Sequence, residues 1–138
     1  MKTSIITALC LGVGLSFTTA ASFAGQCPSN LHQDSEGYWT SNDTPGWKSV
    51  KPTDTKVTVE SKNFGGAIYS PTQKRIACVY KGSDGQWVAL ISNVDHPFNE
   101  DNLNLKVWTF VNKHNIYICG TPKYKLDECT FVISTESH

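Results

Sequence analysis

The sequence predicts a small antiparallel all-β domain, a sandwich or a barrel, with two disulfides. Three observations lead to this fold class. Six to eight short apolar or alternating stretches follow one another, turn residues separate them at regular spacing, and four cysteines follow Ala24. No window of ten or more residues after Ala24 has the apolar stripe of an amphipathic helix. The 138 residues are enough for one domain and too few for two.

The first residues have the pattern of a signal peptide. Lys2 precedes an apolar run at 5–15, and small residues then lead to Ser22-Phe23-Ala24, a Ser-x-Ala form of the cleavage pattern. Polar residues interrupt this stretch before it reaches the roughly 20 apolar residues that a membrane span needs. We therefore expect an exported protein without membrane insertion.

Cleavage is expected after Ala24, with Ala21 as the second choice. Residues 1–24 are then the signal peptide, and residues 25–138 form a single disulfide-linked β domain. The expected location is the periplasm, with full secretion as the alternative, because both are reached by the same export signal.

Four cysteines remain after this cleavage: Cys27, Cys78, Cys119 and Cys129. An even number in an exported protein predicts two structural disulfides, and the absence of any Cys-x-x-Cys argues against a metal or redox site. We expect Cys119 to pair with Cys129 and Cys27 with Cys78. A pairing of Cys78 with Cys119 is the alternative.

Seven stretches are predicted as strands: residues 56–60, 67–69, 75–80, 86–91, 105–111, 116–119 and 129–133. The clearest hairpin joins 75–80 to 86–91 through Gly82-Ser83-Asp84-Gly85. Alternation predicts a core that consists of Val57, Val59, Ile68, Ile76, Cys78, Tyr80, Val88, Leu90, Val107, Trp108, Phe110, Ile118, Phe131 and Ile133.

Charge and motifs exclude several classes of function. The chain has 12 lysines and arginines against 12 acidic residues, and its single arginine, Arg75, together with scattered lysines, forms no basic patch for nucleic acid. Asp95-His96 is the one adjacent acid and histidine pair, and neighbouring side chains point apart in extended backbone. The polar loop 93–104 lacks the spacing of a calcium loop. We expect no catalytic residue, metal or cofactor.

Aromatic residues give the one candidate site. Tyr38, Trp39 and Trp47 lie in the polar, loop-rich stretch 26–55. Burial of an aromatic side chain in the core is less expected there than in a predicted strand. Exposed rings here would suit a sugar face or a protein partner. The other interpretation is that they close one open end of the core.

Several short motifs resemble a known family when taken in order: Cys27-Pro28, Gly37-Tyr38-Trp39, Pro45-Gly46-Trp47, Phe64-Gly65-Gly66-Ala67-Ile68-Tyr69 and Cys78-Val79-Tyr80. The family comprises small exported bacterial β domains without an assigned activity. Within it, the chain resembles the EirA-like proteins, periplasmic factors that are associated with Dot/Icm type IV secretion and needed for the replication of intracellular bacteria.

This resemblance implies a non-catalytic periplasmic interaction factor that supports type IV secretion and intracellular replication. The implied partner is an envelope or secretion-system protein, or a second copy of the chain, and the resemblance supplies no catalytic residues. The alternative function is a glycan-binding module or an inhibitor of a lysozyme-like hydrolase, for which the loop at 95–104 is the candidate binding loop.

Overall fold

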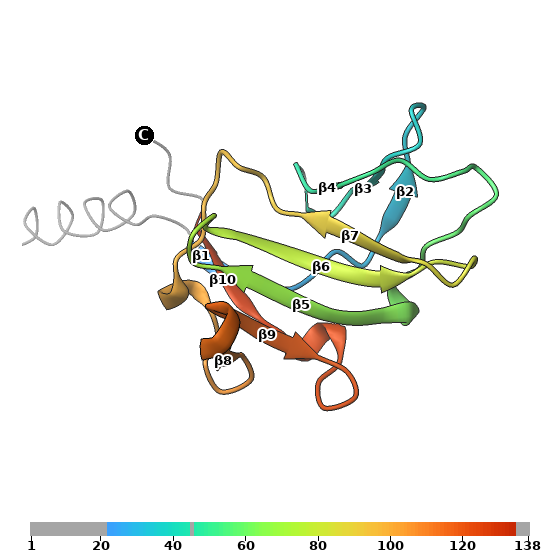
Figure 1. Ribbon diagram of the computed structural model, residues 1–138. Helices are drawn as coiled ribbons and strands as arrows, with labels where there is room; N and C mark the ends of the chain where they lie inside the picture. Colours follow the sequence, from blue (N-terminus) through green and yellow to red (C-terminus); the bar gives the residue numbers. More distant parts are fainter. Residues whose placement is uncertain (1–21, 45, 135–138) are drawn as a thin grey trace, which may run out of the picture.

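The computed structural model describes residues 22–44 and 46–134, which form an antiparallel β protein (Figure 1). The predicted leader up to Ala21, with Cys10 in it, lies outside the described residues. The strands are β1 (Ser22–Gly25), β2 (Leu31–Gln33), β3 (Trp39–Ser41), β4 (Lys48–Ser49), β5 (Phe64–Ser70), β6 (Arg75–Lys81), β7 (Trp87–Ile91), β8 (Thr109–Val111), β9 (Ile116–Gly120) and β10 (Phe131–Ser134). Four short 3-10 helices are η1 (Ser61–Asn63), η2 (Glu100–Asn102), η3 (Asn112–His114) and η4 (Leu126–Glu128).

Eight strands form one sheet in the order β2-β3-β4-β7-β6-β5-β9-β8. The predicted all-β class is confirmed, and within the described residues the sheet is open, with β2 and β8 as its edges. Figure 1 shows β2 and β3 rising steeply from the direction of β5 and β6. Such a bend lets one sheet enclose a core on one of its faces.

The centre of the sheet is the β5-β6-β7 meander. Ala67 of β5 is opposite Cys78 of β6, and Cys78 is opposite Leu90 of β7. The predicted hairpin between β6 and β7 is confirmed: Gly82 donates a backbone hydrogen bond to Gln86 at 2.7 Å, and Gly85 has φ +85°. The left-handed conformation at Gly85 is the one that a turn of this kind requires, because glycine has no Cβ to clash.

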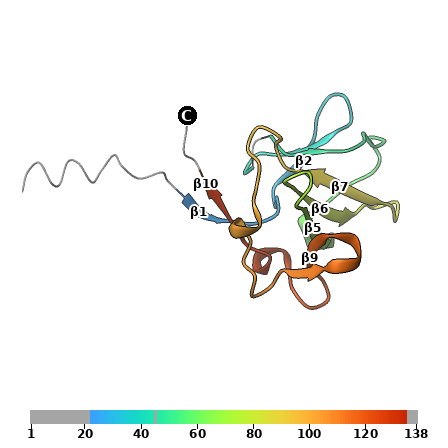
Figure 2. The ribbon, with the colours of Figure 1, turned by 60° about the vertical axis from the view of Figure 1, so that its left-hand side comes forward.

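β1 and β10 form a separate two-stranded ribbon. Gly25 pairs with Phe131 and Ser22 with Ser134, and Figure 2 shows the two strands side by side, extending away from the large sheet. Phe131 anchors this ribbon because its ring is almost fully buried between Trp47 and Phe98, with ring centroids 6.0 and 5.2 Å away. Phe131, at the start of β10, thus covers part of the inner face of the large sheet.

Two buried phenols join the strands to the loops over the inner face. Tyr80 on β6 donates a hydrogen bond to the carbonyl of Pro28 at 2.5 Å, and burial raises the pKa of Tyr80 strongly. Tyr69 on β5 donates to the carbonyl of Phe98 at 2.7 Å. Each bond satisfies a hydroxyl and a carbonyl that would otherwise be buried without a partner.

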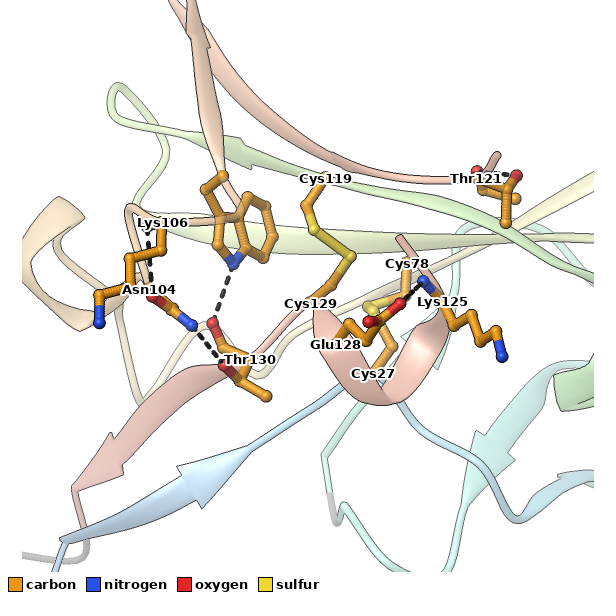
Figure 3. The surroundings of a disulfide bond; sticks show 12 residues. Cys27, Cys78, Asn104, Lys106, Cys119, Thr121, Lys125, Glu128, Cys129 and Thr130 are labelled. Carbon is orange, nitrogen blue, oxygen red and sulfur yellow. Dashed lines mark hydrogen bonds between the residues drawn. A yellow bond between two sulfur atoms is a disulfide. The ribbon is translucent and has the colours of Figure 1, made fainter. Parts of the chain in front are cut away.

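Both expected disulfides form. Cys27 pairs with Cys78 and Cys119 with Cys129, each with a Cα–Cα distance of 5.8 Å, so the alternative Cys78–Cys119 pairing is wrong. Figure 3 shows that η4, with Glu128 accepting from the Lys125 backbone, lies beside the Cys119–Cys129 bond. Two disulfides indicate an oxidising, extracytoplasmic compartment.

Two predicted strands differ from the structure. Residues 56–60 keep the alternating burial, with Val57 and Val59 inside, but they form no ladder, because Thr58 bonds instead to the backbone and hydroxyl of Ser83. The stretch 105–111 forms a strand only from Thr109. Asn104 starts a turn there: its side-chain oxygen accepts from Lys106, as Figure 3 shows.

Three residues of the predicted core are exposed, and the prediction is wrong for them. Ile68 and Ile118 are opposite each other on the outer face of the sheet, because Ala67 and Cys119 take the inner positions of β5 and β9. Phe110 is exposed for a different reason: β8 is an edge strand, and the core does not extend that far.

Candidate functional site

The predicted aromatic patch does not form as an exposed surface. Trp39 and Trp47 are only 7% and 5% exposed, and both belong to the core. Trp39 donates from Nε1 to the hydroxyl of Thr53 at 2.8 Å. Tyr38 is half-buried, and the Nζ of Lys48 lies 4.2 Å from its ring centroid. The interpretation that these rings close one end of the core is therefore the correct one for the two tryptophans.

The loop 93–104 is held against the sheet. Phe98 is buried, Asn99 accepts a hydrogen bond from Lys74 at 3.1 Å, and Glu100 accepts one from Tyr117. The bond to Glu100 is the main cause that raises the pKa of the Tyr117 phenol. These contacts hold the loop against the turn before β6 and against Tyr117 on β9.

Metal-binding groups are not assembled in residues 22–44 and 46–134. There, no three His, Cys, Asp or Glu side chains lie close enough to hold a metal ion. His32 faces Thr40, 2.9 Å from its hydroxyl, and His96 and His114 are exposed. The four described cysteines all belong to disulfides and hold no free thiol.

The candidate site is instead a groove on the outer face of the large sheet. Its volume is about 560 Å³, and its lining is mostly apolar. We call it the outer-face groove and define it by Gly66, Ile68, Val79, Trp87, Ile118, Gly120, Lys123 and Tyr124. A volume of this size is typical of pockets that bind small organic ligands.

Glycines on β5 and β9 form the floor of the groove. Gly66 and Gly120 are opposite each other in the ladder, and a Cβ on Gly120 would lie 2.4 Å from the Cα of Gly66. A Cβ on Gly66 would meet nothing closer than the carbonyl of Cys119 at 3.4 Å. The missing side chains leave a hollow between Ile68 and Ile118 on one side and the start of β5 on the other.

This floor gives a stability prediction. Gly120→Ala should lower the free energy of unfolding by about 1–3 kcal/mol, because its Cβ collides with backbone that cannot move without breaking the ladder. Gly66→Ala, its cross-strand neighbour, should change that free energy by less than about 1 kcal/mol. Urea unfolding of both variants is the measurement, and equal losses in the two would contradict the close approach of the strands.

Trp87 forms one wall of the groove. Its side chain is 58% exposed on β7, and a Cβ on Gly65 would be 2.5 Å from its ring, so the ring lies directly against the glycine backbone. Gly65 is the extra residue where the β5-β6 register shifts. The bulge and its glycine therefore make the room in which this ring rests.

Tyr124 lies on the other side, just after β9. Its backbone N–H donates to the carbonyl of Gly120 at 2.8 Å, and the Cys119–Cys129 disulfide closes the loop to which it belongs. Tyr124 is half-buried and packs against the core. The disulfide thus holds this wall in place.

Lysines mark one end of the groove. Lys123 lies in the lining, with its Nζ 5.5 Å from the Tyr124 ring centroid, and Lys81 is opposite Trp87 in the ladder, with its Nζ 5.6 Å from that ring. Between the side chains that the structure describes, the one ion pair joins Lys62 to Glu60. The two lysines of the rim therefore form no ion pair with an acidic side chain that the structure describes.

Sequence patterning alone does not reveal this groove. Strict alternation identifies two faces of a strand without telling which is inside, and it assigned Ile68 and Ile118 to the core. The available signals were the glycines at 65, 66 and 120, since glycine inside a strand often marks a bulge or a place where another group approaches closely. Trp87 stood beside a turn and was not singled out.

The carboxylate of Asp43 joins the N-terminal segment to β3 through hydrogen bonds. It accepts hydrogen bonds from the hydroxyl and backbone N–H of Ser29, at 2.8 and 3.3 Å, and from the hydroxyl of Ser41. Burial alone would raise the pKa of Asp43, but these hydrogen bonds together outweigh it and keep the pKa below its ordinary value.

This lowered pKa predicts an acid effect. The stabilising contribution of Asp43 is present above the carboxyl pKa of the unfolded chain, about 3.9, and is lost as pH falls through the lower folded value. Asp43→Asn should therefore show a smaller loss of stability between pH 5 and pH 2 than the wild type. The difference should be below about 1 kcal/mol, because the group is exposed. Urea unfolding at several pH values measures it, and parallel pH curves for the two proteins would contradict it.

Comparisons with models of protein families, with curated proteins and with solved structures found no match to this chain. The fold and the site define its class: an extracytoplasmic all-β protein that two disulfides cross-link, with an apolar groove on the outer face of its sheet. In the two described stretches, no helix is long and apolar enough to span a membrane.

Proposed function

We propose that this chain is a non-catalytic binding protein of the bacterial envelope and that the outer-face groove is its binding site. The observation that carries the proposal is the exposure of three large apolar side chains around a hollow: Ile68 (37%), Ile118 (41%) and Trp87 (58%). A contiguous apolar surface with a polar rim is characteristic of a site that another molecule covers.

The proposed setting is the periplasm, reached through the predicted signal peptide. Lys2 and the apolar run at 5–15 support export, and the disulfides agree with an oxidising compartment. The register of β1 favours cleavage after Ala21: that cut leaves the whole strand to pair with β10, whereas a cut after Ala24 would leave only Gly25 of it. The intact mass of the exported protein distinguishes the two cuts.

The proposed occupant is a component of the same envelope. The resemblance to EirA-like proteins supports a type IV secretion system as the setting, with a role in secretion and in intracellular replication. Because Trp39 and Trp47 are in the core, we propose the outer-face groove, rather than the predicted aromatic patch, as the surface of contact.

A site-specific crosslink tests the proposal in the native cell. In one variant, a photo-crosslinking amino acid replaces Thr109, which is exposed and lines the groove. In a control variant of the same chain, it replaces Thr72, which is exposed in the turn between β5 and β6. Each is combined with Gly66→Ile, which fills the groove, or with Gly66→Ala, which leaves most of it open. The mass of the adduct identifies the component.

We expect an adduct from Thr109 in the wild-type and Gly66→Ala backgrounds and at least about a tenfold loss in Gly66→Ile. An adduct that Gly66→Ile does not reduce, or that forms equally from Thr72, would contradict binding in the groove. Circular dichroism of the purified variants shows whether Gly66→Ile keeps the fold, and Gly66→Leu is the replacement if it does not.

A further inference from the structure

We infer that the outer-face groove binds a single linear alkyl chain with an anionic head group, namely a fatty acid of medium chain length. This inference rests on the proposed function, since it names the chemistry of the occupant for the same groove. Its support comes from the backbone of the floor, the apolar walls and the charge of the rim.

The floor of the groove favours an alkyl chain over a peptide. The groove lies on the face of the sheet, and Ala67, at its centre, is paired on both sides, with Cys78 and with Cys119. Backbone donors and acceptors of the floor are therefore used within the sheet. A peptide lying there would bury its own N–H and C=O groups without partners, whereas an alkyl chain has none to satisfy.

The walls have the chemistry that a hydrocarbon chain needs. Ile68, Val79 and Ile118 project from three neighbouring strands, and Trp87 stands beside them. The hydroxyl of Thr121, one of the few polar groups of the lining, is already bonded to the carbonyl of Gly65 at 3.0 Å. Apolar contact is thus the main interaction that these walls offer, and it scales with the length of the chain.

The rim determines the charge of the head group. Lys81 and Lys123 lie at the end of the groove where β5 begins, because Lys81 is opposite Trp87 and Lys123 closely follows Thr121, which bonds to Gly65. Neither lysine forms an ion pair with the described side chains. A carboxylate at this end would place a negative charge between two cations while its chain lies over the glycines.

The fluorescence of Trp87 measures binding in the groove. Of the four tryptophans, Trp39, Trp47 and Trp108 are buried, so iodide quenching and a shift of the emission maximum report on Trp87. Dodecanoate is titrated into the exported protein below its micelle concentration. We expect a blue shift, protection from iodide, and an affinity that rises from octanoate to dodecanoate by about two- to fourfold per methylene.

Variants separate the chain from the head group, and all of them keep Trp87. Gly66→Ile should weaken dodecanoate binding at least about tenfold, with Gly66→Ala close to the wild type. The double variant Lys81→Gln/Lys123→Gln should weaken dodecanoate about three- to tenfold without changing the affinity for dodecanol. Lys51→Gln, at an exposed lysine outside the groove, is the matched control and should change neither.

Three results would overturn the inference. The first is the absence of any dodecanoate-dependent change in the fluorescence of Trp87. The second is dodecanoate binding that Gly66→Ile does not weaken, or an affinity for dodecanol equal to that for dodecanoate. The third is a response to phosphatidylglycerol vesicles without a response to dodecanoate, which would mean a membrane surface rather than a single chain. If dodecanoate fails while the Thr109 adduct still depends on Gly66, the proposed function stands and only the alkyl occupant is wrong.

Discussion

Replacing Cys27 and Cys78 together with alanine is expected to lower the free energy of unfolding by about 4 kcal/mol. The bond spans 51 residues, and a cross-link over a loop of that length restricts the unfolded chain by about this amount in the chain-entropy description. Both cysteines are fully buried, so the lost packing adds to the effect. Against a typical total of about 5–15 kcal/mol, the loss is large enough to unfold part of the population.

The Cys119→Ala/Cys129→Ala double variant is the matched comparison. Its loop has a separation of 10 residues, for which the same description gives about 3 kcal/mol. Urea unfolding of both variants and the wild type measures the two losses. If the Cys27→Ala/Cys78→Ala variant is as stable as the wild type, the Cys27–Cys78 bond does not contribute to the stability of the fold.

The short disulfide should also affect the groove. It closes the loop that carries Lys123 and Tyr124, whereas Cys27–Cys78 crosses the opposite, inner face of β6. Loss of the short bond is therefore expected to weaken binding in the outer-face groove under conditions where the protein stays folded.

Trp47→Ala is the second substitution with a large expected effect, a loss of about 3–5 kcal/mol. The ring is 5% exposed and stacks on Phe131 with centroids 6.0 Å apart, so its removal leaves a cavity between β4 and the β1-β10 ribbon. Trp39→Ala should cost a similar amount and also leave the Thr53 hydroxyl without the hydrogen bond from the indole. Thermal unfolding is the measurement, with an expected fall of more than about 10 °C.

Trp87→Ala is the control for these two substitutions. The Trp87 side chain is mostly exposed, so its loss should change the free energy of unfolding by less than about 1 kcal/mol while it removes a wall of the groove. If Trp47→Ala and Trp39→Ala unfold normally and instead lose the envelope adduct, the aromatic residues of the N-terminal half are the binding surface and the outer-face groove is not.

Hydrophobic patterning predicted much of the central sheet. β6 and β7 appeared as apolar runs on either side of a glycine-rich turn, and the structure has this hairpin with the expected residues. Patterning was less successful at Val57 and Val59, where alternation correctly indicated burial but not the lack of a partner strand. Alternation reports which side chains are inside, whereas a ladder also needs a neighbouring backbone in register.

The face of each strand could not be read from alternation alone in β5 and β9. Both have apolar or small residues at successive positions, so Ile68 and Ile118 were equally consistent with the core. Tyr69 and Cys119 decide the matter: Tyr69 bonds to Phe98, and Cys119 must reach Cys129 on the inner side. Each of these contacts joins segments distant in the sequence, which local periodicity does not record.

The sequence by itself determined the antiparallel all-β class, the central hairpin and the presence of two disulfides, because period-two patterns, turn residues and an even set of cysteines are local or countable properties. Tertiary structure decided between the two pairings that the sequence left open. Tertiary structure alone decided that Trp39 and Trp47 are core residues and that Gly66, Gly120 and Trp87 surround a groove. The physical reason is that burial depends on which distant segments cover a strand: the N-terminal loops and β10 cover the inner face, while no described segment fills the hollow over the glycines.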